Sequence, residues 1–170
     1  TIQLEDYDIG GEGVAFSDSS VGNSGGAYRT ATGEDVDITT GGTGFVTNAL
    51  SGGEYTRYTV TIAETGEYEM LVHYRTNSDS SKPFEAAIKP RDLSSSTTLF
   101  TTETGSTTSG IRKVTDGSGA VTFGDYTSET FSLTKGVWIL ELKIPSGGAG
   151  PLYDYVTINN TQILSIPTPS

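Results

Sequence analysis

The stretch EYEMLVHYRT, residues 67–76, decides the fold class of this chain. In a β-strand, successive side chains point to opposite faces. One face of this stretch carries Tyr68, Met70, Val72 and Tyr74, and the other carries Glu67, Glu69, His73 and Arg75. This alternation of apolar and polar side chains predicts a strand with one face in a core and the other facing water.

Similar runs lie on both sides of this strand, at the spacing of a β-sandwich or barrel. Residues 54–63 bring Tyr58, Val60 and Ile62 to one face in the same way. The later runs are residues 84–89, 130–134, 137–144, 153–158 and 161–166. Glycine-containing turns separate the runs, and no long segment shows the 3.6-residue period of a helix. The sequence therefore predicts an all-β sandwich.

The chain is most simply read as one domain over residues 1–166. Residues 167–170 have the Pro/Thr/Ser composition of the start of a linker. No apolar run approaches the roughly 18–20 residues that span a bilayer, so we expect no membrane partner. The N-terminus has no basic and apolar leader, and we expect any export signal to have been removed or to lie upstream. A domain cut from a longer exported chain has these properties.

The chain is strongly acidic, with 10 Lys and Arg against 21 Asp and Glu and a formal net charge of −11. Such a charge repels a phosphate backbone, so we expect no nucleic-acid partner. The chain has no cysteine, which excludes disulfides, a cysteine nucleophile and a thiolate metal site. A candidate basic patch falls in or beside the Ser/Thr/Gly-rich stretch 77–120 and consists of Lys82, Lys89, Arg91, Arg112 and Lys113.

Candidate catalytic residues are few. His73 is the only histidine and lies inside a predicted strand, where a histidine is more often structural or exposed than catalytic. Paired carboxylates can hydrolyse glycosides, but Asp35 with Asp37 is equally well explained as a pair of solvent-facing strand positions. We therefore expect no enzyme. The enzymatic alternative, a small β-sandwich lyase or hydrolase, requires His73 or a carboxylate pair in a groove with its partners in reach.

The carboxylates fit a hard cation better than catalysis, because calcium is bound by oxygen ligands from carboxylates, amides and backbone carbonyls. In the opening IQLED, alternation places Gln3 and Glu5 on one face of a strand. Asp154 interrupts an apolar and aromatic strand, on the face of Leu152 and Val156. A carboxylate there is costly to bury unless it is paired or bound to a metal. The alternative is an Asp154 that is exposed at a strand end or accepts a backbone N–H.

Five blocks of this sequence occur in the order in which family 6 carbohydrate-binding modules carry them, and they extend over nearly the whole chain. These blocks are IQLEDYD, GGEGVAFSDSSVGNSGGAYR, EDVDI, GGEYTRYTV and LYDYVTI. They resemble the family blocks I-x-A-E-D-Y, G-V-A-Y followed by G-N-x-G-G-x-Y-R, V-D-I, G-E-W-L-x-Y-T-V and L-D-Y-I. Families 35 and 36 share the fold and some of these blocks, and residues 77–122 match least. The resemblance implies a β-sandwich of jelly-roll type, with two antiparallel sheets, that binds polysaccharide and serves an appended catalytic domain.

The resemblance also implies a structural calcium ion between the first strand and a late strand. Gln3 and Glu5 match the two ligands of the opening block, and Asp154 matches the aspartate of L-D-Y-I. Arg29, in AYR, matches the position that contributes a backbone carbonyl. The ion would tie the two ends of the chain together and stabilise the fold rather than contact the sugar.

For the sugar site, the resemblance implies a cleft among the loops at one edge of the sandwich, where two aromatic rings hold a sugar ring. GTGFVT and AVTFGDY place Phe45 and Phe123 at these two positions. Where the family has a hydrogen-bonding asparagine, this chain has Leu152. Hydrogen bonds to a sugar would then come from other loop residues, such as Asp18 and Asn48.

Three alternatives to this cleft remain open at this point. A second cleft on the concave face of one sheet is used by some members of the family. Sugar binding is lost in the second alternative. In the third, Phe45 and Phe123 simply pack at the edge of the core.

Together these observations predict a non-catalytic, calcium-stabilised module that binds a polysaccharide or oligosaccharide and targets a covalently linked, glycan-active catalytic domain. We expect it to be a monomer and to be secreted or displayed at a cell surface, in a bacterium. The alternative is a calcium-stabilised structural or adhesion domain without affinity for glycans.

Overall fold

The computed structural model describes residues 1–48, 50–77, 84–91, 97–101, 114–115, 117–147 and 149–161. All regular elements in these ranges are β-strands. They are β1 (Ile2–Gln3), β2 (Phe16–Ser17), β3 (Ile38–Gly41), β4 (Gly44–Thr47), β5 (Tyr55–Ile62), β6 (Gly66–Arg75), β7 (Glu85–Pro90), β8 (Thr97–Thr101), β9 (Val114–Thr115), β10 (Val121–Thr122), β11 (Gly124–Thr127), β12 (Phe131–Leu133), β13 (Gly136–Lys143) and β14 (Leu152–Asn160). None of the described segments is a helix that could cross a membrane. The linker predicted at 167–170 and the strand predicted at 161–166 lie outside the described residues, apart from Thr161.

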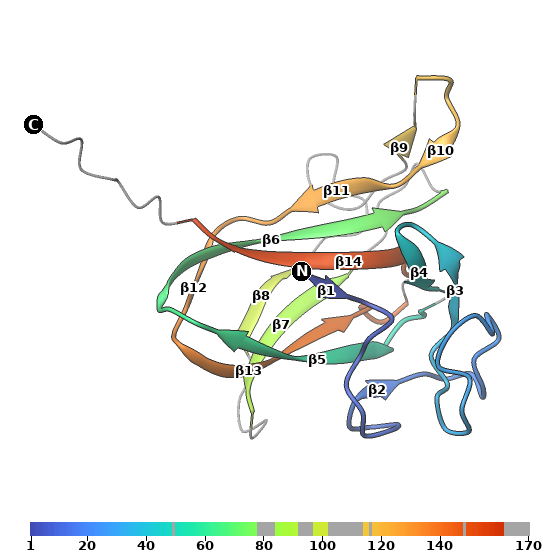
Figure 1. The fold of residues 1–170 in the computed structure, drawn as a ribbon, viewed down its shortest axis with the longest axis horizontal. Helices are drawn as coiled ribbons and strands as arrows, with labels where there is room; N and C mark the ends of the chain where they lie inside the picture. Colours follow the sequence, from blue (N-terminus) through green and yellow to red (C-terminus); the bar gives the residue numbers. More distant parts are fainter. Residues whose placement is uncertain are drawn as a thin grey trace, which may run out of the picture.

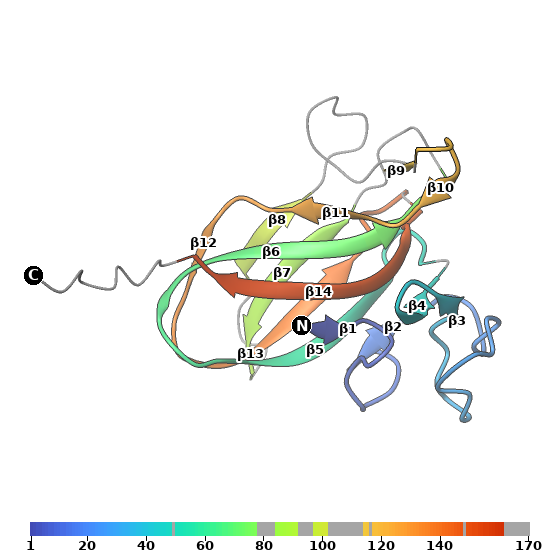
Figure 2. The ribbon, with the colours of Figure 1, turned by 45° about the horizontal axis from the view of Figure 1, so that its top comes forward.

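Twelve of the strands form two antiparallel sheets that pack face to face (Figure 1), and β9 and β10 form a separate two-stranded sheet. A seven-stranded sheet has the order β11-β6-β14-β4-β3, with β1 paired to β14 and β12 paired to β6. A five-stranded sheet has the order β2-β5-β13-β7-β8. Figure 2 shows β6 and β14 of the first sheet crossing in front of β7 and β13 of the second. The predicted all-β sandwich with two antiparallel sheets is confirmed.

The core forms where the inner faces of the two sheets meet, as the alternation in residues 67–76 predicts. In β6, the inward side chains of Tyr68, Met70, Val72 and Tyr74 are buried. From the other sheet, β5 and β13 contribute Tyr58, Val60, Ile62, Leu140 and Leu142. Burial of this apolar surface is the main force that holds the two sheets together.

A β-bulge in β14 changes which residues share a face with Asp154. Tyr153 is opposite Tyr74 of β6, but the next paired residue is Tyr155, opposite His73, so Asp154 is the extra residue of the bulge. The two residues of a bulge oppose a single residue of the partner strand and bend the strand locally. Asp154 therefore lies on the outward face with Tyr155 and His73. The prediction that Asp154 shares a face with both Leu152 and Val156 was wrong, because strict alternation does not continue through a bulge.

The glycine-rich stretch 39–55 contains most of the β3–β4 hairpin. Gly41 of β3 pairs with Gly44 of β4, so the turn between them consists of Gly42 and Thr43. Gly42 has a φ of 53°, in the left-handed region that glycine adopts without steric cost. The glycines thus supply a tight turn rather than an extended loop.

The buried tyrosines Tyr58 and Tyr153 differ in how their hydroxyl groups are satisfied. Tyr58 donates to the carbonyl of Leu4 at 2.8 Å and lies 2.9 Å from Oγ1 of Thr56. The hydroxyl of Tyr153 is buried without a hydrogen-bond partner among the described residues. Burial raises the pKa of both phenols, so both remain neutral at physiological pH.

This difference predicts opposite responses to the same substitution. We expect Tyr58→Phe to lower the free energy of unfolding by about 1–3 kcal/mol, because it leaves the buried Leu4 carbonyl with one hydrogen bond fewer. Tyr153→Phe removes an unpaired hydroxyl, so we expect it to leave the free energy of unfolding unchanged or slightly higher. Urea unfolding of the two variants and the parent measures both effects. A loss in Tyr153→Phe as large as that in Tyr58→Phe would contradict this assignment.

Candidate functional site

The first strand runs beside β14 and brings two predicted cation ligands next to the third. Gln3 of β1 is opposite Tyr155 of β14, and the N–H of Leu4 donates to the carbonyl of Asp154 at 2.9 Å. Gln3 and Glu5 therefore flank the residue that binds the backbone of Asp154. Gln3 Oε1 and Glu5 Oε2 are buried, and neither has a hydrogen-bond partner among the described residues. Both orphaned oxygens require an explanation, because buried polar atoms normally have partners.

Asp154 is fully buried beneath the β3–β4 turn. Its two carboxylate oxygens accept hydrogen bonds from the N–H and the hydroxyl of Thr43, each at 2.9 Å. Gly42 packs so closely on this carboxylate that a Cβ at that position would lie 2.3 Å from Oδ2 of Asp154. Of the possibilities that the sequence left open for Asp154, exposure at a strand end is thus excluded, and the bond to a backbone N–H is present.

The negative charges of Asp6 and Asp154 repel the carboxylate of Glu5. Burial raises the pKa of Glu5, and the negative charges of Asp6 and Asp154 raise it further, against a hydrogen bond from the backbone N–H of Glu5 that lowers it. The described residues contain no cluster of three His, Asp or Glu side chains that could hold a metal ion. A cation here would therefore also need carboxamide and backbone oxygens, which are ligands that calcium accepts. The donor set of Gln3, Glu5 and Asp154 fits calcium on this basis.

Arg29 lies close in space to the residues that follow Glu5. Its guanidinium stacks on the ring of Tyr7 at 3.5 Å from the centroid, donates to the Tyr7 carbonyl and forms an ion pair with Glu34 at 2.9 Å. The neighbouring Tyr28 donates its hydroxyl to Asp6 at 2.9 Å. Arg29 has a φ of 52°, which is uncommon for a residue with a side chain. These contacts hold the backbone of Arg29 in its unusual conformation beside the segment that carries Glu5.

The two predicted sugar-stacking rings, Phe45 and Phe123, lie on opposite faces of the β3–β4 hairpin. A Cβ on Gly41 would lie 3.2 Å from the side chain of Val46 and 3.7 Å from Cζ of Phe123, so Phe123 is on the Val46 face. Phe45 precedes Val46 in the strand and points the other way. There its ring stacks on Tyr28, with centroids 5.1 Å apart. The structure thus does not bring the two phenylalanines to one face.

The predicted hydrogen-bonding residues, Asp18 and Asn48, relate to Asp37 in different ways, because the charge of Asp37 acts on Asp18 whereas the Asp37 backbone binds Asn48. The N–H of Asn48 donates to the carbonyl of Asp37 at 2.8 Å. Asp18 accepts from the N–H and hydroxyl of Ser20 at 2.8 and 2.6 Å. Burial raises the pKa of Asp18, and the nearby charges of Glu54 and Asp37 act in the same direction. Asp18 is therefore a carboxylate in a crowded acidic loop region.

An aromatic row that sequence reasoning missed crosses the outward face of the seven-stranded sheet. The His73 ring is stacked between Phe123, at 5.4 Å between centroids, and Tyr155, at 4.7 Å. Asp125, opposite His73 in the register of β11 and β6, places Oδ1 2.6 Å from His73 Nδ1. We call Phe123, His73, Tyr155 and Asp125 the aromatic row. Alternation in residues 67–76 predicts the outward position of His73, but the bulge that turns Tyr155 outward has no clear sequence signal.

The surroundings of His73 do not match those of a general base. Nδ1 is bonded to Asp125, and Nε2 faces Oδ2 of the buried Asp154 at 3.8 Å. Both ring nitrogens thus face carboxylates of the protein, and both ring faces are covered by aromatic rings. A catalytic histidine instead needs a nitrogen within hydrogen-bond reach of its substrate. The contacts of His73 support a structural or binding role.

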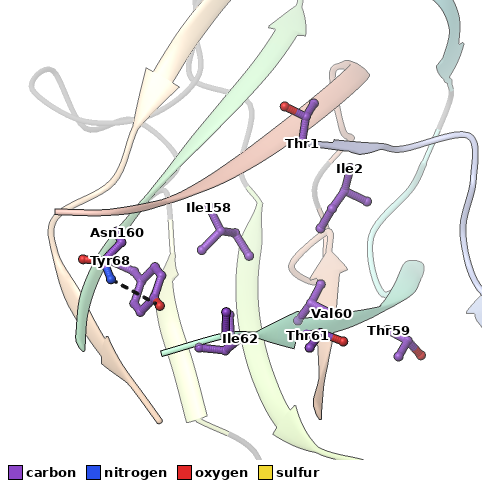
Figure 3. Close-up of a pocket in the computed structure, with 10 residues that line it drawn as sticks. Thr1, Ile2, Thr59, Val60, Thr61, Ile62, Tyr68, Ile158 and Asn160 are labelled. Carbon is purple, nitrogen blue, oxygen red and sulfur yellow. Dashed lines mark hydrogen bonds between the residues drawn. The ribbon is translucent and has the colours of Figure 1, made fainter. Parts of the chain in front are cut away.

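A separate hollow lies at the open seam between the two sheets (Figure 3). Its lining consists of Thr1, Ile2, Thr59, Val60, Thr61, Ile62, Ala63, Tyr68, Ile158 and Asn160. The Tyr68 hydroxyl, which also donates to the Glu64 carbonyl, accepts from the Asn160 amide at 3.5 Å. None of the predicted metal or carbohydrate residues is among the described residues that line this hollow.

No protein-family model and no curated protein matches the sequence. Solved structures match it closely in fold at low identity. The C-terminal family 6 module of LamC, a laminarinase from Zobellia galactanivorans, has a TM-score of 0.58 at 14% identity, over 94% of this chain and 97% of that one. A family 6 module of lichenase 5A from Cellvibrio mixtus, solved with cellotriose, gives 0.55 at 16% identity, over 95% and 96%.

A family 36 module belongs to the same set of structures. It comes from a multidomain xylanase of the Trinervitermes trinervoides hindgut metagenome, with a TM-score of 0.52 at 18% identity over 95% of this chain and 97% of that one. Because nearly the full length of each chain is matched, the likeness covers both sheets. The chain therefore has the β-sandwich fold of carbohydrate-binding modules.

Proposed function

We propose that this chain is a non-catalytic carbohydrate-binding module that attaches an appended glycan-active enzyme to a polysaccharide or oligosaccharide. The observation that carries this proposal is the aromatic row on the outward face of a fold used by carbohydrate-binding modules. Aromatic rings pack against the apolar faces of sugars, and polar groups at their edges bind the hydroxyl groups. Asp125, half exposed at the edge of the row, is a suitable acceptor for such hydroxyls.

Phe123 is the member of the predicted phenylalanine pair that belongs to this row. Phe45, stacked on Tyr28, offers a second aromatic surface on the other face of the hairpin. Asp18 and Asn48 are the proposed hydrogen-bonding residues of the glycine-rich loops. A glycan would then contact the aromatic row and the Phe45–Tyr28 surface separately, and no single sugar ring would lie between Phe45 and Phe123.

A structural calcium ion is the second part of the proposal. Its ligands are the side chains of Gln3, Glu5 and Asp154 and the backbone carbonyl of Arg29. The orphaned oxygens of Gln3 and Glu5 support this assignment, because an oxygen-binding cation would satisfy both and relieve the repulsion between Glu5 and Asp154. When bound, the ion supplies positive charge to a buried site and no reaction chemistry.

The proposed setting is a secreted or cell-surface protein of a bacterium, in which this module is a monomer joined covalently to a catalytic domain. Attachment to an insoluble or gel-forming glycan would raise the effective concentration of substrate around that domain. The absence of cysteine is compatible with this setting.

One observation favours a second candidate, a structural or adhesion domain without glycan affinity. Phe45 and Phe123 lie on opposite faces of their hairpin, and Leu152 occupies the position of the hydrogen-bonding asparagine. This candidate keeps the calcium ion and the fold but requires no sugar contact at the aromatic row.

Affinity electrophoresis distinguishes the two candidates. Gels would contain xylan, β-glucan, agar, carrageenan, alginate or fucoidan, each run with calcium and with chelator. We expect retardation by at least one neutral glycan, and we expect Phe123→Ala to weaken it about tenfold or more, because an aromatic anchor is worth about 2 kcal/mol at a binding site. Phe45→Ala, measured in the same gels, tests whether the surface formed by Phe45 and Tyr28 also contacts the glycan. If no glycan retards a protein that calcium still stabilises, the adhesion candidate replaces the proposal.

A further inference from the structure

A second surface with defined chemistry lies on the solvent face of the five-stranded sheet, on the side of the sandwich away from the aromatic row. Polar side chains alternate with the core residues of β5, β7 and β13 and point to this face. In the register of the strands, Arg57 is opposite Glu141, and Lys89 is opposite Ile139. These pairs bring two cations and one carboxylate together.

Positive charge is in excess at this surface. Oε2 of Glu141 accepts from Nε of Arg57 at 2.8 Å and from Nζ of Lys89 at 2.6 Å. Burial tends to raise the pKa of Glu141, but the hydrogen bonds and charges of Lys89 and Arg57 hold it below its ordinary value. Glu141 is thus ionised at neutral pH and balances only one of these two cations. With Asp8 and Arg91 of the adjacent groove included, three cations face two carboxylates. This local excess occurs in a chain whose formal net charge is −11.

Beside these residues is a groove whose lining includes two arginines, Arg57 and Arg91. The remaining lining consists of Asp8, Ile9, Val14, Ala15 and Ile139. Ile9 is 92% exposed and Val14 is 58% exposed, which is unusual for side chains of this size. The carboxylate of Asp8 already binds the N–H and hydroxyl of Thr59, at 2.9 and 2.8 Å. We call this lining the basic groove.

The loop that carries Val14 and Ala15 forms one side of the basic groove. Hydrogen bonds from Arg57 of β5 hold this loop against the sheet, so the groove is preformed. Nη1 of Arg57 donates to the carbonyls of Gly13 and Val14, the latter at 2.6 Å. The backbone N–H of Arg57 donates to the carbonyl of Ala15 at 2.8 Å. Arg57 is therefore a positioning residue that also adds charge. Arg91, just after β7, is exposed and also lines the groove.

We propose that the basic groove binds an acidic sugar residue of a glycan chain, one that carries a carboxylate or a sulfate group. Arg91 pairs with the anionic group, because a guanidinium presents parallel N–H donors that match such oxygens. Ile9 and Val14 pack against the apolar face of the sugar ring. The inference rests on the proposed glycan-binding function and adds a second site with its own sugar class.

The test uses the whole chain in gels with calcium present throughout. Polygalacturonate supplies the carboxylate, carrageenan supplies the sulfate, and xylan and laminarin serve as neutral glycans. We expect one acidic glycan to retard the protein, and retardation to weaken in high salt. Arg91→Ala should lower that affinity about tenfold, and Arg91→Lys should lower it less. Lys135→Ala removes the same charge from an exposed residue outside the groove and should leave the affinity unchanged.

The results separate this inference from the proposed function. Binding to an acidic glycan that Arg91→Ala does not weaken, or weakens no more than Lys135→Ala does, would overturn the basic groove as its site. Binding to neutral glycans alone would also overturn it, while leaving the module function intact. Binding to none of the glycans would overturn both. Comparing polygalacturonate with carrageenan identifies which anionic group the groove accepts.

Discussion

We expect calcium to raise the melting temperature of this protein by about 8–16 °C when it is present at roughly 1,000 times its dissociation constant. Binding at that excess contributes about 4 kcal/mol to the free energy of unfolding, and each kcal/mol shifts the transition by about 2–4 °C in a chain of this length. The physical reason is the pair of orphaned oxygens on Gln3 and Glu5 beside the buried Asp154 carboxylate. Differential scanning calorimetry with calcium and with EDTA measures the shift.

The variant Glu5→Gln provides the matched control, because it keeps the size and the carbonyl oxygen but removes the charge that the cation would neutralise. We expect its melting temperature to be insensitive to calcium. In the absence of calcium it should be at least as stable as the parent, since burial and the charge of Asp154 disfavour ionised Glu5. A melting temperature that is the same in calcium and EDTA for the parent protein would remove the metal site from the proposal.

Gly42→Ala should be among the most destabilising single substitutions in the chain, with an expected loss of about 3 kcal/mol or more. The new Cβ would lie 2.3 Å from Oδ2 and 2.4 Å from Cγ of Asp154, and Asp154 is fully buried. The carboxylate cannot move away without losing its two hydrogen bonds from Thr43. A φ of 53° adds the cost of placing a side chain in the left-handed region.

Gly44→Ala is the control for this effect. Gly44 belongs to the same hairpin, but a Cβ there meets no atom within 4 Å. We expect Gly44→Ala to change the free energy of unfolding by less than about 1 kcal/mol in urea titrations. Equal losses in the two variants would show that the hairpin backbone, and not the contact with Asp154, determines the cost. Because Gly42 touches a proposed calcium ligand, its variant should also lose most of the response to calcium.

The sequence alone predicts the parts of the fold that depend on local alternation. Residues 67–76 show it most clearly, since the predicted inward side chains of Tyr68, Met70, Val72 and Tyr74 are all buried. The position of Asp154 was predicted less well, because the bulge in β14 is set by pairing with β6 rather than by any residue of β14 itself. The hairpin at residues 38–47 has no comparable alternation, because glycines occupy its turn and both strand ends there.

In the candidate site too, the features that depend on local sequence could be predicted, and those that depend on strand pairing could not. Gln3, Glu5 and Asp154 could be selected because polar residues stand out in apolar strands, and in the structure Gln3 and Glu5 flank Leu4, whose N–H binds the Asp154 carbonyl. The aromatic row could not, because Phe123, His73 and Tyr155 come from three separate parts of the chain and meet only through the cross-strand register. The opposite orientations of Phe45 and Phe123 likewise depend on hairpin pairing. Both facts require the three-dimensional arrangement of the strands.

The pairing of β1 with β14 also determines how the module responds to mechanical force. Thr1 lies against Thr157, with their hydroxyls 3.2 Å apart, so Thr1 and Thr161 emerge from the same end of this antiparallel ladder. Pulling on these two residues would unzip the ladder one bond at a time instead of shearing all bonds together. The opening would first release Ile2 and then reach Gln3, Leu4 and Glu5. A cation bound there would stabilise the chain just behind the first few bonds, so the force needed to open this end would rise with the logarithm of the calcium concentration.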